Sequence, residues 1–107
     1  MKTIPIASIQ IAPNRQRRDF DAAKLQELAD GIVKRGLLHP IILRKEGDKF
    51  YLVAGERRLR AITDIYGFGG YFLHDGQRIP DDEVPYTLLS DLDPFAAEEA
   101  ELEENIH

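Results

Sequence analysis

Two consecutive arginines, Arg57 and Arg58, stand directly after Gly55-Glu56, in the first turn of a predicted helix. The N-terminus of a helix carries partial positive charge, so cations in its first turn cost stability. That turn also offers free backbone N–H groups, and a glycine beside it lets a ligand approach the backbone closely. Guanidinium groups grip phosphate through paired hydrogen bonds. Residues 55–58 therefore predict a phosphate site, in which a bound anion offsets the cost of the two cations.

A purely structural interpretation of these arginines also stays open. Arg60 lies four residues after Glu56 and four before Asp64, a spacing that suits a ladder of surface ion pairs. Arg57 and Arg58 have no such partners within their own helix, so the ladder does not explain them. No G-x-x-x-x-G-K-[ST] phosphate loop occurs elsewhere in the chain.

Charge is distributed unevenly along the 107 residues. All 14 Lys and Arg lie in residues 1–78, whereas residues 79–107 carry 10 acidic groups and no basic one. A basic body with an acidic end suits an anionic ligand or nucleic acid, although a solvated acidic helix would give the same pattern. The chain has no Cys, which excludes disulfides, thiolate metal sites and a cysteine nucleophile. The apolar runs are too short to span a bilayer, so we expect a cytoplasmic protein with no membrane partner.

The order of predicted elements indicates a small α+β domain with a short mixed sheet, a hairpin and about three helices. We expect an opening strand within residues 4–9, a helix from an Asp21 cap to about Arg35, and a hairpin of strands 41–44 and 50–54. A second helix at about 56–66, a strand at 84–89 and a final helix from Asp93 follow. Residues 67–83 predict a long loop or an extra small hairpin. The expected buried stripe of the first helix is Leu25, Leu28, Ala29, Ile32 and Val33.

At GERRLRA the sequence resembles the G-E-R-R-x-R-A box of the ParB N-terminal domain, which has the ParB/sulfiredoxin-like fold. NRQRRDFD followed by KLQELADGIVKRGLLHPIILR resembles that family's opening box, its helix and the strand after it. EENIH resembles the start of its closing Glu-Asn box. The likeness covers nearly the whole chain, so we expect one domain over residues 1–107. A short first box, His39 in place of the common Gln, and an insertion at 67–83 are more similar to phage- or plasmid-type relatives.

In ParB proteins this module is a CTP-binding switch for a DNA clamp, so the resemblance implies CTP or another nucleoside triphosphate with Mg²⁺. It assigns the phosphates to Gly55, Glu56, Arg57 and Arg58. It assigns the metal to Glu104 and Asn105. It assigns the nucleoside side to Gln16, Arg17, Gly36, His39 and Pro40. The basic residues that could contact the DNA backbone, or form a solvated loop, are Arg15, Arg17 and Arg18.

The resemblance also implies partners beyond this chain. We expect DNA binding and homodimerisation in the full-length protein, because the family's helix-turn-helix and dimerisation domains are absent here and the final helix looks truncated. Catalysis stays open between a slow CTPase and, as an alternative, a ParB-like nuclease or phosphoryl-transfer enzyme that uses Glu56 and Glu104. A third hypothesis is a protein-interaction domain with a vestigial site. The lack of Cys excludes sulfiredoxin chemistry.

Overall fold

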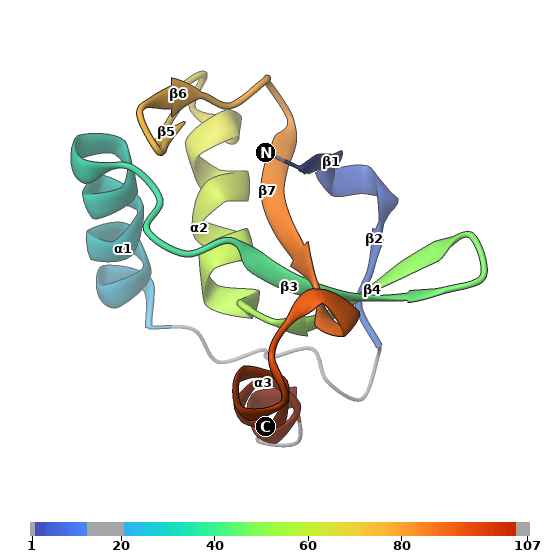
Figure 1. Ribbon diagram of the computed structural model, residues 1–107. Helices are drawn as coiled ribbons and strands as arrows, with labels where there is room; N and C mark the ends of the chain where they lie inside the picture. Colours follow the sequence, from blue (N-terminus) through green and yellow to red (C-terminus); the bar gives the residue numbers. More distant parts are fainter. Residues whose placement is uncertain (1, 13–20, 105–107) are drawn as a thin grey trace.

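The computed structural model describes residues 2–12 and 21–104, which form a mixed α/β domain with three helices (Figure 1). The α-helices are α1 (Ala22–Arg35), α2 (Glu56–Gly67) and α3 (Pro94–Glu104). The strands are β1 (Thr3–Pro5), β2 (Ile9–Gln10), β3 (Ile41–Glu46), β4 (Lys49–Ala54), β5 (Leu73–His74), β6 (Gln77–Arg78) and β7 (Glu83–Leu88). The predicted fold class is confirmed, and residues 67–83 contain the extra hairpin as β5 and β6.

Five strands form one sheet in the order β1-β7-β3-β4-β2. The β1–β7 and β3–β4 pairs are antiparallel, whereas β7–β3 and β4–β2 are parallel. The two edge strands are consecutive in the chain, joined only by the 3₁₀ turn at Ile6–Ser8. Four residue steps reach about 14 Å, but the edges of a flat five-stranded sheet lie about 19 Å apart. The sheet must therefore curl, and the predicted opening strand is divided between its two edges.

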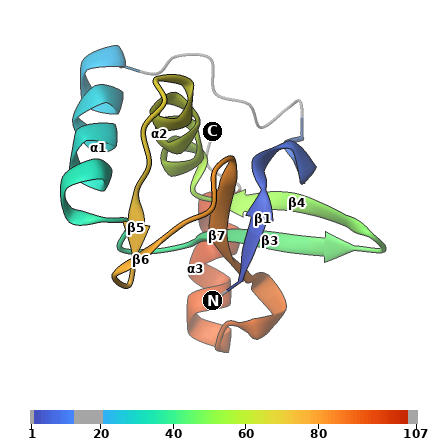
Figure 2. The same ribbon diagram turned by 90° about the horizontal axis from the view of Figure 1, so that it is seen from above.

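The helices cover both faces of this curled sheet (Figures 1 and 2). α1 and α2 lie side by side on one face, over a core that includes Leu25, Ile32, Leu43 and Ile62. α3 lies across the opposite face, where Ala100 packs with Val53 and Ala54 of β4. This arrangement brings the acidic C-terminal helix to the end of β4, directly before the arginine-bearing first turn of α2.

Local capping chemistry fixes where the helices begin and end. The Asp21 carboxylate accepts from the N–H groups of Ala23 and Lys24 at 2.9 and 3.2 Å, which confirms the predicted cap of α1. Gly36 ends α1 with a φ of +85°. At α3, Asp93 accepts from the Ala96 N–H at 2.9 Å. The sequence patterns thus predicted these helix boundaries correctly.

One buried position was predicted wrongly. Val33 was expected in the apolar stripe of α1, but its side chain is 53% exposed. It lies beside the gap between α1 and α2, where Phe68 at the end of α2 is also exposed rather than packed over it. Within the described residues, no helix is long and apolar enough to cross a membrane.

Candidate anion-binding groove

A groove runs along α1, between that helix, the turn that follows it and the first turn of α2. It consists of two adjoining hollows of about 600 and 210 Å³, which share Leu28, Gly31 and Arg35. The larger hollow, here called the anion end, is also lined by Lys24, Glu27, Asp30, Lys34 and Arg57. The smaller hollow, here called the turn end, is also lined by Ile32, Gly36, Leu37, Leu38, His39 and Arg58.

The anion end is cationic and contains Arg57. Four cationic side chains line it against two acidic ones. Arg57 is exposed and, within the part of the chain that the structure describes, makes no hydrogen bond or ion pair with a protein group. Because Gly55 is the N-cap of α2 and has no side chain, it cannot cap the helix itself. Arg57 is thus an exposed guanidinium in the first turn of a helix, placed to meet an anion.

Arg58 behaves differently, because it is tied to the protein. Its Nη1 donates to the carbonyl oxygens of His39 at 2.9 Å and Pro40 at 2.8 Å. Burial lowers the pKa of the Arg58 guanidinium, and the nearby Glu103 carboxylate opposes that shift. A guanidinium has five N–H donors, so those on Nε and Nη2 remain for another acceptor. Arg58 therefore joins the first turn of α2 to the turn after α1.

Gly55 is required by its backbone and by its neighbours. Its φ is +103°, and a Cβ there would lie 2.9 Å from Ile41 Cγ2 and 3.0 Å from Arg58 Nη2. The sequence suggested that Gly55 leaves room for a ligand at the backbone. Instead, the space beside its Cα is filled by Ile41 and Arg58, so Gly55 lets these side chains approach the junction.

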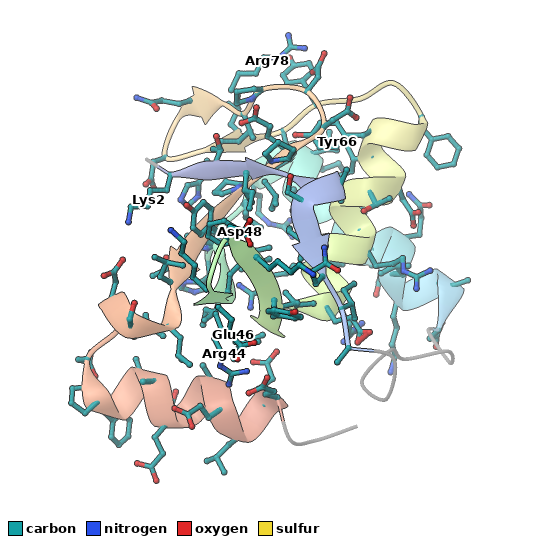
Figure 3. The ribbon with its side chains drawn as sticks, turned by 90° about the vertical axis from the view of Figure 1, so that its right-hand side faces the viewer. Lys2, Arg44, Glu46, Asp48, Tyr66 and Arg78 are labelled. Carbon is teal, nitrogen blue, oxygen red and sulfur yellow. The ribbon has the colours of Figure 1, made fainter. Side chains whose placement is uncertain are left out.

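Two carboxylates of α3 meet the same junction. Glu103 Oε1 accepts from the Gly55 N–H at 3.1 Å. Glu104 pairs with Arg44 through both oxygens, at 2.7 and 3.0 Å, and Figure 3 shows Arg44 between the sheet and the end of α3. A backbone N–H at the start of a helix attracts negative charge. The protein's own carboxylate thus already lies where an anionic guest is expected.

The structure describes only one of the two residues that were predicted to bind the metal. Glu104 is engaged with Arg44, and Asn105 lies outside the described residues. Among residues 2–12 and 21–104, no group of three His, Cys, Asp or Glu side chains is placed to hold a metal ion. The side chains described here therefore do not form a Mg²⁺ site in this arrangement, and we assign no step to the metal.

The groove gathers several of the residues that the sequence singled out. Gly36, His39 and Arg58 line the turn end, Pro40 joins them through its carbonyl, and Arg57 lies in the anion end. Glu56 lines a separate hollow with Arg60. The remaining predicted residues, Arg15, Gln16, Arg17 and Arg18, lie outside the described part of the chain.

Sequence reasoning missed the wall of the groove that α1 supplies. Lys24, Leu28, Gly31 and Arg35 are spaced by four, three and four residues, which places them in one stripe along the helix. The Arg35 guanidinium lies against Gly31, in the space that a Cβ at this position would occupy. A glycine inside an otherwise regular helix was the signal that could have pointed to this stripe.

A curled mixed sheet with two helices on one face and an acidic helix on the other defines a domain of the ParB/sulfiredoxin-like class. Three solved structures share this architecture. ParB from Caulobacter crescentus, C-terminally truncated and complexed with CTP-gamma-S, matches with a TM-score of 0.62 and 30% identity over 98% of this chain and 52% of its own. The same protein complexed to the centromeric parS site matches with a TM-score of 0.58 and 27% identity, over 98% of this chain and 46% of its own. Sulfiredoxin from Arabidopsis thaliana, at 0.59 and 22% identity over 81% of each chain, shares the fold alone.

The chain belongs to the ParB N-terminal domain family, whose model matches residues 1–66. It is 50% identical over 58 residues to the chromosome-partitioning protein Spo0J of Thermus thermophilus, covering 54% of this chain and 22% of the relative. It is 46% identical over 68 residues to a nucleoid occlusion protein of Bacillus anthracis, covering 61% of this chain and 23% of the relative. The matched part thus spans about a fifth of the length of these curated relatives.

Proposed function

We propose that this domain binds a nucleoside triphosphate, with CTP as the first candidate, in the groove between α1 and α2. In the full-length protein it would act as the N-terminal switch of a ParB-like DNA clamp. The observation that carries the proposal is that Arg57, which has no partner among the described residues, lies in a cationic hollow that adjoins a second, more apolar hollow. The similarity to a ParB protein complexed with CTP-gamma-S supports the choice of ligand.

The two hollows suit the two parts of such a ligand. The triphosphate would lie in the anion end, where Arg57, Lys34 and Arg35 supply positive charge. The nucleoside would lie in the turn end, where Leu28, Ile32 and the backbone of the turn offer apolar surface and peptide groups. Arg58 lines the turn end, and its N–H donors on Nε and Nη2 would be available to a phosphate.

Binding would compete with the acidic helix. Glu103 accepts from the Gly55 N–H, and a phosphate near that amide would be repelled by the Glu103 carboxylate. A phosphate bound near the Gly55 N–H and the present position of α3 would therefore oppose each other, which makes nucleotide binding a way to move α3. Movement of α3 would then be the output of the switch. Homodimerisation and DNA binding in the full-length protein are parts of the same proposal.

Mg²⁺ would supply charge neutralisation to the bound triphosphate, with Glu104 and Asn105 as the family-implied ligands. Glu104 would first have to leave Arg44. For nuclease or phosphoryl-transfer activity we find no specific support, because the carboxylates of the described residues do not gather around a metal position. Slow hydrolysis of the nucleotide is left as a question for experiment.

Calorimetric titration of the chain with CTP, ATP and GTP, with and without Mg²⁺, tests the proposal. We expect selective CTP binding that weakens about tenfold or more in Arg57→Ala, because a charged hydrogen bond is worth about 1.5–3 kcal/mol. The melting temperature should stay unchanged, since Arg57 is exposed. Arg60→Ala, which removes the same charge from the next turn of α2, should change affinity little.

Other outcomes would redirect the assignment. If no nucleotide binds at millimolar concentration, the interaction-domain hypothesis replaces this one. If the highly purified chain cleaves DNA in a metal-dependent way, that activity supports the nuclease alternative.

A further inference from the structure

The β5–β6 hairpin lies outside residues 1–66, the part that the family model matches, yet it is firmly built. Its two-residue turn, Asp75-Gly76, has φ values of +51° and +76°, which suit a type I′ turn. Phe72 and Ile79, which flank the hairpin, are each only 1% exposed. These buried anchors fix the hairpin to the core, so it can act as a rigid support.

The hairpin supports the turn end of the groove. The Leu37 N–H donates to the Leu73 carbonyl oxygen at 2.8 Å, and Leu37 and His74 form a parallel bridge. A Cβ on Gly36 would lie 2.9 Å from the same Leu73 oxygen, so only glycine permits this approach. Figures 1 and 2 both show β5 beside the end of α1 and the start of the turn.

His74 completes this contact from inside the protein. Its side chain is 6% exposed, and Nδ1 lies 2.6 Å from the Leu37 carbonyl oxygen. A carbonyl oxygen can only accept, so Nδ1 carries the proton and donates. Nε2 lies 3.5 Å from the exposed Asp75 carboxylate. Consecutive residues of β5 therefore hold both the N–H and the C=O of Leu37.

The turn is consequently fixed at both of its ends. The hairpin holds Leu37, and Arg58 holds the carbonyls of His39 and Pro40. Only Leu38 lies between these attachments, and its side chain is 74% exposed. The backbone that lines the turn end thus cannot change shape unless one attachment breaks, and a rigid, preformed wall favours a ligand that fits it over one that does not.

We propose that His74 is a positioning residue, which holds the Leu37 peptide so that the turn end accepts the nucleoside and discriminates between bases. This inference rests on the proposed function, because it concerns the same groove. It assigns the hairpin a role that is separate from phosphate binding, since neither His74 nor its strand lines the anion end.

A comparison of CTP with inorganic tripolyphosphate tests this role. In His74→Leu we expect CTP affinity to fall about tenfold, and the preference for CTP over GTP to shrink, while tripolyphosphate affinity stays unchanged. His74→Asn should recover most of the CTP affinity, because its side-chain amide can donate from nearly the place of Nδ1. Gln77→Ala, on the exposed strand of the same hairpin, is the matched control.

The outcomes separate this inference from the proposed function. If the wild-type chain binds neither probe, the proposed function fails. If it binds CTP but His74→Leu weakens both probes equally, or weakens neither, only the positioning role is overturned. Should His74→Leu not fold, hydrogen exchange at the Leu37 amide of the wild-type chain decides. If the Leu37 amide is strongly protected from exchange before CTP is added, the turn is preformed, as this inference requires. If that amide exchanges as fast as one in an open loop, the inference is overturned.

Discussion

The two ends of the groove are built in different ways. The turn end is held by short hydrogen bonds to backbone groups, from the hairpin on one side and Arg58 on the other. The anion end consists of exposed charges, with Arg57 unpaired among the described residues. Hydrogen bonds that hold backbone groups in place fix a shape, whereas exposed charges can exchange partners at low cost. The comparison teaches that one end is suited to recognition and the other to switching.

The largest effect should come from Arg58, which holds the turn and is proposed to contact a phosphate as well. Arg58→Ala would leave the carbonyls of His39 and Pro40 without their donor, so we expect the free energy of unfolding to fall by about 2–3 kcal/mol. CTP affinity should fall about 100-fold, because turn shape and phosphate contact are lost together. Urea unfolding and calorimetry measure the two effects.

A lysine at this position provides the control for Arg58. Arg58→Lys keeps the positive charge but lacks the planar fork that reaches two carbonyls, so its stability should lie between those of wild type and Arg58→Ala. The burial that lowers the pKa of Arg58 would lower the pKa of a lysine at this position too. Because the ordinary pKa of lysine is lower than that of arginine, the lysine would lose its charge more easily. An Arg58→Ala protein as stable as wild type would contradict the idea that Arg58 fixes the turn.

The second effect tests how tightly the junction is packed. Gly55→Ala introduces a Cβ at a φ of +103°, 2.9 Å from Ile41 Cγ2, and should cost about 2–3 kcal/mol of stability. Gly47→Ala is the matched control, since its φ is +63° and no atom lies within 4 Å of the new Cβ. It should cost only about 1 kcal/mol. If thermal unfolding showed the same loss of stability in both variants, the crowding of the new Cβ by Ile41 and Arg58 would contribute nothing to the cost of Gly55→Ala.

Local patterns in the sequence predicted most of the fold. Asp21 and Asp93 mark helix starts through caps within three residues, and both caps form. The sequence also predicts that the arginine turn is a site for anions, which stays a prediction. The partners of this turn were not predicted, because Arg58 bonds to a residue 19 positions earlier and Gly55 to one 48 positions later. Such contacts depend on how α3 and the turn pack against the sheet, and the spacing of residues along the sequence does not predict that packing.

The third effect should have the opposite sign. Glu103→Gln keeps the size of the side chain but removes the charge that competes for the Gly55 N–H. We expect CTP and tripolyphosphate to bind about three- to tenfold more tightly, by similar factors, because the charge that is removed would repel the phosphates that both ligands carry. The gain should shrink at high salt. Glu101→Gln, a control at an exposed position of the same helix, should change the affinity for either ligand little. An equal gain in affinity there would show that the effect comes from the overall charge of α3 and not from the Glu103 contact.

The smallest effect concerns how the hairpin segment joins α2. The Tyr66 hydroxyl lies 2.7 Å from the Glu83 carbonyl oxygen and 3.1 Å from that of Pro80, and Figure 3 shows Tyr66 directed at this segment. Tyr66→Phe removes these contacts but keeps the ring, which packs against Phe72. We expect CTP affinity to fall only about twofold and tripolyphosphate affinity to stay the same. Equal changes for both ligands would mean that the segment does not act through the turn end.

The same hydroxyl gives the chain a dependence on alkaline pH. Burial raises the pKa of Tyr66 from 10.0 to about 12, and the carboxylates of Asp81, Asp82 and Glu83 add to the shift. Between these values the folded chain keeps a proton that the unfolded chain has lost, so this contribution to stability is complete below pH 10 and falls as the pH rises towards 12. Urea unfolding across that range should show a shallower loss in Tyr66→Phe than in wild type. A parallel loss in both proteins would show that the group which titrates is not Tyr66.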